Sequence, residues 1–328
     1  MMRLVASLAV LVVVSLGIVF MFQPKAQPAS SEPSDQETFA ADRDDGFDAG
    51  KAMDYLKTIC KLGPRISGSK AMHKQQELLK KHFEDCGAKV TLQRFTARQR
   101  SQKDPINMAN LIVSWHPELT RRVLLCTHYD TRPLADQEPD HSRWKDGFLG
   151  ANDGASGVGL LMELGNHMKD LPTKVGVDFV FLDGEEYIFD PREGGDRYCL
   201  GSEYFGEQYM RTQPKSRYIA GVLLDMVGGK GASFQIEQNS WRAAGPLVQD
   251  LWRIAAAEKC TAFDGHLGGE VLDDHVFLNR ARIPTADIID SNYFKTHWHR
   301  LSDVPENCST STLSQVARVL IVWLKRVR

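Results

Sequence analysis

Six apolar, strand-like runs recur along the chain, and stretches with helical spacing separate most of them. Several of these runs are apolar on both faces, which is typical of strands covered by helices on both sides. A chain that alternates such strands with helices is predicted to fold as an α/β three-layer sandwich in one domain, with a mixed, mostly parallel central sheet and helices on both faces. The runs cover residues 90–95, 110–115, 122–130, 177–183, 219–227 and 284–290.

Helical spacing of apolar residues appears around and between these runs. LGPRISGS, between the first two helical stretches, supplies the Gly and Pro residues that interrupt helices. In open sheets of this kind, ligands bind beyond the carboxyl ends of the strands, so those ends are where functional residues are expected. The expected helices span residues 47–61, 69–86, 154–169, 202–211, 245–259 and 310–327.

The charge balance excludes one broad class of partner. The 328 residues include 40 Lys and Arg and 42 Asp and Glu, which gives a formal net charge of -2. A nucleic-acid-binding surface needs a basic excess to neutralise phosphates, so no nucleic-acid partner is expected. The six cysteines are widely spaced and form no C-x-x-C pair. Neither a zinc ribbon nor a dense disulfide framework is therefore expected.

The N-terminal residues are expected to lie outside the folded domain. Residues 4–22 carry no charge, follow Arg3, and are about long enough to span a bilayer as a helix. We therefore interpret residues 1–22 as an N-terminal membrane anchor or signal peptide, and residues 23–45, rich in Pro, Ser and acids, as a flexible linker. The positive-inside rule then places the catalytic domain, residues 46–328, outside the cytoplasm, either membrane-anchored or secreted.

Acids and histidines gather where three of the strand-like runs end. VLLCTHYD ends with His128 and Asp130, VFLDGEE ends with Glu185 and Glu186, and GVLLD ends with Asp225. Each acid alone is typical of a solvated loop or a helix N-cap. Together, several carboxylates in one cleft would cost roughly several kcal/mol apiece unless a cation compensated them. The loops between and after these runs add Asp153, Asp273, Asp274, His275, His297 and His299.

The adjacent Glu185 and Glu186 have three interpretations: a solvated turn, the first turn of a helix, or a metal site. The surrounding donors are oxygens and imidazoles, with no thiolate among them. Such a ligand set favours a catalytic zinc with an open position over a closed structural zinc. Adjacent side chains that leave a strand end point in different directions, so one can face a metal and the other the substrate.

These motifs resemble the zinc aminopeptidases of peptidase family 28. The similarity covers residues 50–328, with the motifs in family order. Within the family, the glutaminyl-peptide cyclotransferases, or glutaminyl cyclases, are more similar, because Asp273 and Trp298 stand where the aminopeptidases commonly have Ser and Tyr. The motifs are HYD at 128–130, GANDGASG at 150–157, LDGEE at 182–186, LLDMVG at 223–228, and the DDH and WH segments near the end.

For a cyclase, the resemblance implies a single zinc held by Asp153, Glu186 and His299. The WH dipeptide favours His299 over His297 as the third ligand. The reaction would convert an N-terminal Gln of a peptide or protein to pyroglutamate and release ammonia.

The resemblance also implies which residues surround the substrate. Glu185 would be the proton shuttle, while Asp225 and Asp273 would share hydrogen bonds near the leaving ammonia. Trp298 would form part of the substrate pocket. The cyclases have a second pocket Trp just after the Glu-Glu pair, which is missing here, and Phe189 is the nearest aromatic residue.

Two other functions stay open. A zinc aminopeptidase would hydrolyse N-terminal residues of peptides with two zincs that share Asp153; His128 and Asp225 would complete the second site, and Glu185 would activate a bridging water. Asp130 would then orient His128. A catalytically inactive extracellular binding module is the third possibility, although such relatives lose ligands that this chain keeps. In each case we expect a monomer, held to the membrane through its N-terminal segment unless that segment is cleaved.

Overall fold

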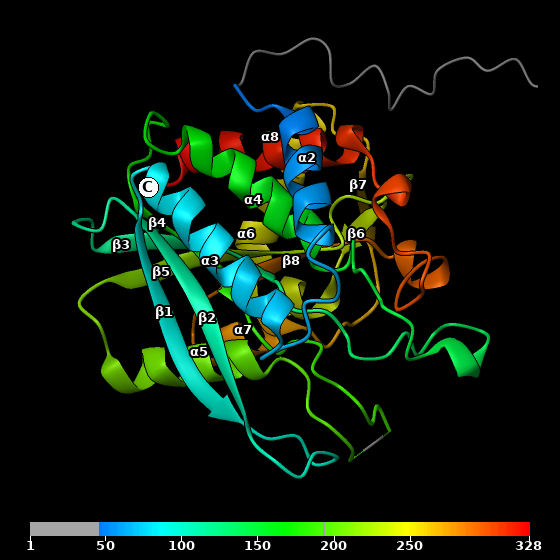
Figure 1. Ribbon diagram of the computed structural model, residues 1–328. Helices are drawn as coiled ribbons and strands as arrows, with labels where there is room; N and C mark the ends of the chain where they lie inside the picture. The colour runs from blue at the N-terminus through cyan, green and yellow to red at the C-terminus, as the bar shows by residue number, and fades with distance from the viewer. Residues whose placement is uncertain (1–45, 193) are drawn as a thin grey trace, which may run out of the picture. The chain divides into compact units, whose positions relative to one another are not determined.

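The computed structural model describes residues 46–192 and 194–328 (Figure 1). The predicted membrane anchor or signal peptide and the linker lie outside these described residues. Among the helices of the described part, none is both long and apolar enough to cross a membrane. The strands are β1 (Lys89–Ala97), β2 (Ile106–Trp115), β3 (Arg121–His128), β4 (Gly176–Leu182), β5 (Arg217–Asp225), β6 (Phe234–Ile236), β7 (Phe263–Leu267) and β8 (Thr285–Ile289).

A six-stranded sheet with the order β1-β2-β4-β3-β5-β8 forms the centre of the fold. Strands β4, β3, β5 and β8 pair in parallel, whereas β2 pairs antiparallel with both β4 and β1. The predicted mixed, mostly parallel sheet is therefore confirmed. Because parallel strands end at the same edge, His128 at the end of β3 and Asp225 at the end of β5 lie at one edge of the sheet.

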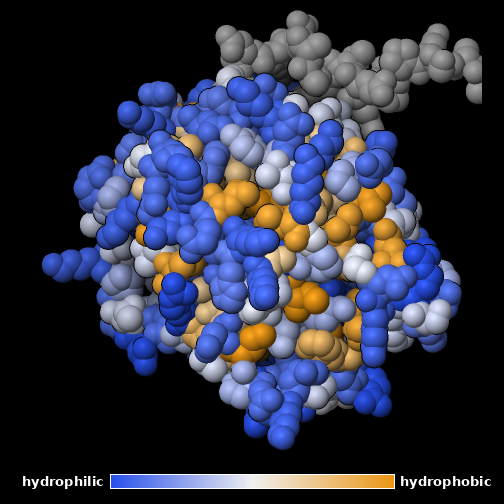
Figure 2. Space-filling view, viewed as in Figure 1, coloured by the Kyte–Doolittle hydropathy of each residue, from blue (hydrophilic) through white to orange (hydrophobic). Residues whose placement is uncertain are grey.

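Helices cover both faces of the sheet, which confirms the three-layer sandwich. In Figure 1, α5 and α7 lie below the sheet, and α2, α4 and α8 lie above it. Figure 2 shows that one side of the molecule is largely covered by hydrophilic side chains, with apolar ones in patches between them. The helices are α2 (Ala49–Cys60), α3 (Lys70–Asp85), α4 (Ala155–His167), α5 (Leu200–Thr212), α6 (Gln238–Ala257), α7 (Asp274–Arg280) and α8 (Thr310–Arg326).

Alternating residues of the strands divide between two apolar cores, as the period of two in a strand requires. On β3, Val123 and Leu125 belong to the large core that includes residues of α2, α4 and α8. Leu124 and Cys126 belong to the smaller core, with Phe205 of α5. Both faces of β3 are therefore buried, which explains why residues 123–126 are apolar without interruption.

Two short strands and the short helix α7 were not predicted, and α6 begins well before its expected first residue. The short strands β6 and β7 pair with each other outside the main sheet, and α7 follows Asp273. Helix α6 begins at Gln238, not at residue 245, because the side chain of Glu237 accepts hydrogen bonds from the first-turn amides. Pro246 is accommodated inside this helix next to a kink at Ala244.

Small residues at the start of α4 allow this helix to pack closely on the sheet. A Cβ atom on Gly157 would lie 2.8 Å from Cβ of Thr127 on β3 and 2.9 Å from the carbonyl oxygen of Leu224 on β5. Gly154, which precedes the helix, has a φ of +91°, and a Cβ there would lie 2.9 Å from Cε1 of His128. These two glycines therefore bring the loop that carries Asp153 against the ends of β3 and β5.

Candidate metal and catalytic site

Asp153, Glu186 and His299 meet at the carboxyl edge of the sheet, although they come from three separate loops. Donor atoms of the three side chains lie within 4.8 Å of one another, and all three residues are buried. Nε2 of His299 lies 2.6 Å from Oε1 of Glu186 and 3.7 Å from Oδ2 of Asp153. Oδ2 of Asp153 is buried without a hydrogen-bond partner. Two carboxylates and an imidazole with a free oxygen fit a catalytic zinc ion that keeps an open position.

His299 is held from its other side by a residue that the sequence did not point to. Nδ1 of His299 lies 3.0 Å from Oδ1 of Asp136. Asp136 also accepts hydrogen bonds of 2.9 and 2.8 Å from Arg132. Burial alone would raise the pKa of Asp136, but the hydrogen bonds from His299 and Arg132 lower it to about 2. Asp136 is therefore a carboxylate that fixes the orientation of the His299 ring, as partners of metal-binding histidines do.

Two further buried carboxyls fix the backbone of the ligand loops. Oδ1 and Oδ2 of Asp303 accept the amides of Asn152, at 2.8 Å, and Asp153, at 3.1 Å. Asp130 accepts the amides of Glu185, at 3.2 Å, and Glu186, at 3.1 Å. These two carboxylates therefore hold the backbone of the loops that carry Asp153 and Glu186. Asp303 lies four residues after His299, and its position in the sequence did not indicate that it would hold the loop of Asp153.

The role expected of Asp130 needs a correction. Its Oδ1 lies 3.6 Å from Nδ1 of His128, too far for a hydrogen bond, and Nδ1 has no hydrogen-bond partner. The carboxylate of Asp130 is instead occupied by the two backbone amides of the Glu-Glu turn. Asp130 therefore contributes to the charge around His128 but does not fix the orientation of its ring.

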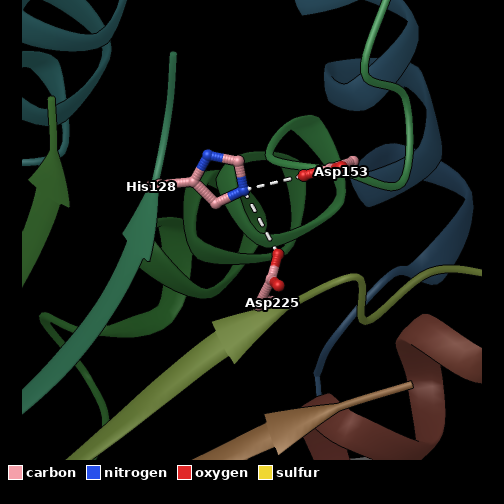
Figure 3. A group of neighbouring side chains, drawn as sticks. All are labelled: His128, Asp153 and Asp225. Atoms are coloured by element: carbon pink, nitrogen blue, oxygen red, sulfur yellow. Dashed lines mark hydrogen bonds and ion pairs between the residues drawn. The ribbon is translucent and has the colours of Figure 1, made fainter. Parts of the chain in front are cut away.

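His128, Asp153 and Asp225 form a second group that could hold a cation (Figure 3). Nε2 of His128 lies 3.1 Å from Oδ1 of Asp153 and 3.2 Å from Oδ1 of Asp225. Burial lowers the pKa of His128, but its hydrogen bonds and charge interactions with the surrounding carboxylates outweigh that effect and raise it. Asp153 belongs to both groups, with Oδ1 toward His128 and Oδ2 toward His299. The arrangement expected for a second metal is thus also present.

Glu185, Asp225 and Asp273 line a cavity of about 70 Å³ together with the three ligands. Burial raises the pKa of all three carboxyls, and burial together with the nearby Asp225 raises that of Asp273 to about 7. Oδ1 of Asp273 accepts the amide of Asp274 at 2.5 Å, whereas Oδ2 is buried without a partner. The cavity therefore contains proton-holding carboxyls beside the metal ligands. The thiol of Cys199 donates to Oε1 of Glu185 at 3.7 Å.

Trp298 lies at the cavity as expected, but Phe189 does not. The Trp298 ring stacks on His299, with 3.7 Å between centroids, and Phe294 packs edge-on against Trp298. Phe189 packs edge-on against Tyr187, and its amide donates to Asp196, which turns this segment away from the cavity. The place of the missing Trp is not filled by Phe189. The other apolar and aromatic lining residues are Tyr198, Val271, Leu272, Ile289 and Phe294.

The remaining residues that the sequence offered for the site lie either near the surface or in the core. His297 is partly exposed, and its Nδ1 lies 2.9 Å from the hydroxyl of Ser302, so His299 and not His297 reaches the ligand group. His275 is fully buried, with Nε2 lying 3.0 Å from Glu237 and Nδ1 3.4 Å from Asp287. Asp274 is also fully buried, and burial together with Asp273 raises its pKa to about 8. His275 and Asp274 are not among the residues that line the cavity.

The α/β sandwich and the buried carboxylate–histidine site at its carboxyl edge define a metal-dependent enzyme of the α/β class. The model of peptidase family M28 matches residues 110–324. The chain belongs to peptidase family M28, which confirms the resemblance found in the sequence.

Three relatives illustrate the range of activities in the family. A bovine glutaminyl-peptide cyclotransferase-like protein is 25% identical over 268 residues, which cover 73% of this chain and 65% of the relative. The crystal structure of Fimbriiglobus ruber glutaminyl cyclase is 44% identical with a TM-score of 0.84, and the match covers 92% of this chain and 100% of that one. The crystal structure of a Zn-dependent exopeptidase from Parabacteroides distasonis is 31% identical with a TM-score of 0.77. The match covers 86% of this chain and 99% of that one. These relatives are enzymes, so the prediction of an enzyme is confirmed and the inactive binding module is set aside.

Proposed function

We propose that this enzyme is a glutaminyl-peptide cyclotransferase, which cyclises an N-terminal Gln to pyroglutamate and releases ammonia. The observation that carries the proposal is the position of Asp273. This buried carboxyl lines the cavity with Glu185 and Asp225, and its Oδ2 has no hydrogen-bond partner. A shared proton between Asp225 and Asp273 would leave Asp225 less suited to bind a second cation. The high similarity to a glutaminyl cyclase over nearly the whole chain also supports the proposal.

The proposed reaction is an intramolecular displacement at the side-chain amide of the substrate. The α-amine forms a bond to the amide carbon, and the bond from that carbon to its nitrogen breaks. Glu185 takes a proton from the attacking amine and returns it to the departing nitrogen. Burial raises its pKa above the usual range of a carboxyl, which favours the protonated form that the second transfer needs. Asp225 and Asp273 accept hydrogen bonds from the leaving nitrogen. A zinc ion held by Asp153, Glu186 and His299 would polarise the carbonyl as a Lewis acid.

The cavity is small, which suits a substrate that folds back on itself. Its volume of about 70 Å³ is on the scale of one side chain. The reaction needs no water, and a site that holds the substrate folded back on itself brings the amine to the amide carbon.

An aminopeptidase with two metal ions is the second candidate, and one observation favours it. His128, Asp153 and Asp225 form a complete second ligand group that shares Asp153 with the first. In that case Glu185 would activate a water molecule instead of moving a proton between two nitrogens of the substrate.

The two candidates are separated by activity and metal content measured on one sample. Purified protein is incubated with Gln-β-naphthylamide and with Leu-p-nitroanilide, and bound zinc is measured by atomic absorption. Pyroglutamate formation with one zinc per chain is the expected result. Leucine release with two zincs per chain, and no pyroglutamate, would overturn the cyclase proposal.

The proposal extends to the whole chain. Residues 46–328 would be the catalytic domain, outside the cytoplasm, with residues 1–22 as anchor or signal peptide and residues 23–45 as the linker. Its support is the uncharged run at residues 4–22. We also infer that the enzyme is a monomer with peptide or protein N-termini as substrates. Cell fractionation with protease accessibility tests the location, and light scattering of the purified protein tests the oligomeric state.

A further inference from the structure

The edge of the sheet opposite the catalytic site carries a group of exposed cations. Arg121 and Arg217, at the starts of the parallel strands β3 and β5, are register partners in the sheet. Arg217 and Arg282 line one cavity of about 860 Å³, and none of the described residues that line it is acidic. Nη2 of Arg121 donates to the main-chain carbonyl of Arg328 at 2.5 Å, so the end of α8 adjoins the start of β3. The exposed cations at or shortly before the strand starts and at the end of α8, called the basic pole here, are Arg121, Lys174, Lys215, Arg217, Arg282, Lys325, Arg326 and Arg328.

The cations of the basic pole lack the carboxylate partners that cations near the catalytic edge have. In the loop that leads from β3 to α4, for example, Arg143 pairs with Asp146 at 3.0 Å. Within the part of the chain that the structure describes, no cation of the basic pole forms an ion pair. Glu118 and Asp170 are exposed acids on this side of the molecule, but the cations outnumber them. A group of cations that is not neutralised in this way produces a positive potential, which attracts anionic surfaces.

The described part of the chain begins on the same side as the basic pole. Helix α4 starts against the carboxyl ends of β3 and β5, so its last residue, His167, lies toward the opposite edge of the sheet. A Cβ atom on Gly46 would lie 3.5 Å from Nδ1 of His167, and the amide of Asp48 donates to Oε1 of Glu163 at 3.3 Å. The linker proposed for residues 23–45 would therefore join the folded domain on the side of the basic pole.

We propose that the basic pole docks on the surface of an anionic lipid bilayer and turns the catalytic edge away from it. This inference goes beyond the proposed reaction and rests on the membrane anchor proposed for residues 1–22. The linker proposed for residues 23–45 would span about 25 Å on average, which keeps the basic pole within reach of the lipid headgroups. Several Lys and Arg side chains near an anionic bilayer act together, so the attraction suffices to orient a domain that is already held nearby.

The distribution of charge favours a bilayer over nucleic acid as the partner. The cations are spread over the starts of several strands and the end of a helix, and they do not form a stripe along one helix. The chain as a whole has a formal net charge of -2, whereas nucleic-acid-binding domains usually have a basic excess. Docking of the basic pole leaves the catalytic edge facing the aqueous phase, from which peptide N-termini would enter the site.

The accessibility of single lysines tests this orientation. The full chain is reconstituted into nanodiscs of phosphatidylcholine alone or of phosphatidylcholine mixed with phosphatidylglycerol, and the acetylation rate of each lysine is measured by mass spectrometry. We expect Lys215 and Lys325 to react about threefold more slowly or less in the anionic nanodiscs. Lys103, in the β1–β2 loop, and Lys145, in the loop before α4, are exposed near the catalytic edge and should react equally in both. The protection should disappear in about 1 M NaCl, which shortens the screening length to about 3 Å.

Two double variants provide a matched comparison of charge. Arg217→Gln combined with Arg328→Gln removes two exposed charges from the basic pole and is expected to halve the protection of Lys215 and Lys325 or reduce it further. Lys103→Gln combined with Lys145→Gln removes the same charge near the catalytic edge. This second variant is expected to leave the protection of Lys215 and Lys325 unchanged.

The outcomes separate this inference from the proposed function. Equal acetylation of Lys215 and Lys325 in both kinds of nanodisc would overturn the docking and leave the anchor intact. Equal protection of Lys103 and Lys145 would overturn the orientation, and recovery of the protein in neither kind of nanodisc would overturn the anchor and this inference together. Stronger protection of Lys215 and Lys325 by an added DNA duplex than by the anionic bilayer would assign the basic pole to nucleic acid instead. Pyroglutamate formation from Gln-β-naphthylamide, measured on the same nanodiscs, tests the cyclase proposal separately.

Discussion

Nδ1 of His299 lies 3.0 Å from Oδ1 of Asp136, and Arg132 holds Asp136 with two hydrogen bonds. The carboxylate keeps the ring turned so that Nε2 faces Glu186 and Asp153. We expect Asp136→Ala to weaken zinc binding about 10- to 100-fold, which is the usual effect of removing the partner of a metal-binding histidine. Competition with a chromogenic chelator measures the change.

Asp140 offers a matched control for Asp136. It lies four residues further along the same loop and is exposed, and it accepts a hydrogen bond from the amide of Ser142. Asp140→Ala is expected to bind zinc as the unmodified enzyme does. Equal affinity of the Asp136 variant and the Asp140 variant would show that the contact with His299 does not support the metal site.

Glu185 and Glu186 are adjacent in the chain, but we expect the loss of Glu186 to affect zinc binding and the loss of Glu185 to affect kcat. Glu186→Gln should lose zinc, because Oε1 of Glu186 lies 2.6 Å from Nε2 of His299 within the ligand group. Glu185→Gln should keep zinc and lower kcat by about 10²- to 10⁴-fold, the usual contribution of a general acid–base. Zinc content and kcat are measured on both proteins. Equal loss of metal in the two variants would contradict this division of roles.

Much of the fold and the ligand group could be predicted from the sequence because the signals are local. Apolar runs such as residues 177–183 identify buried strands, and the acids that follow them identify the carboxyl edge. Since parallel strands end at one edge, His128 and Asp225 were expected to approach each other, and their side chains lie 3.2 Å apart. The structure adds the geometry that the pattern could not give.

The supporting residues could not be predicted, because their partners are distant in sequence. Asp303 accepts the amides of residues 152 and 153, and Asp136 contacts His299 across a similar separation. The sequence assigns neither acid a partner, and each alone is indistinguishable from a solvated loop residue. Phe189 failed as a prediction for a related reason: nearness in sequence to the Glu-Glu pair did not reveal that Asp196 turns this segment away.

Stability should depend on pH through Asp274. Burial and the neighbouring Asp273 raise the pKa of Asp274 from 3.8 to about 8. Between these two values the folded state holds a proton that the unfolded state lacks, so the free energy of unfolding falls as pH rises through this window. Asp274→Asn removes this titration. We therefore expect the variant's Tm, relative to the unmodified enzyme, to be higher at pH 8 than at pH 5 by about 3 °C.

Thermal unfolding at both pH values checks this sign. Asp170, which is exposed, provides the control, and Asp170→Asn should shift the Tm equally at pH 5 and pH 8. A relative Tm of the Asp274 variant that falls between pH 5 and pH 8 would mean that Asp274 is ionised in the folded enzyme.

The close packing of α4 on the sheet links stability to the metal site. A Cβ on Gly157 would lie 2.8 Å from Cβ of Thr127 and 2.9 Å from the carbonyl oxygen of Leu224, so Gly157→Ala must displace the helix or the strands. We expect a loss of about 1–3 kcal/mol in the free energy of unfolding, measured with urea. Zinc affinity should fall as well, because the loop before α4 carries Asp153 against His128.

Gly245 separates this packing effect from the general effect of replacing glycine in a helix. It lies in α6, and a Cβ there would have no atom within 4 Å. Gly245→Ala is therefore expected to leave zinc affinity unchanged and to change the free energy of unfolding by less than about 1 kcal/mol, because the added methyl group meets no other atom. If Gly157→Ala were as stable as Gly245→Ala and bound zinc as tightly as the unmodified enzyme, the close packing of α4 on the strand ends would not determine zinc affinity.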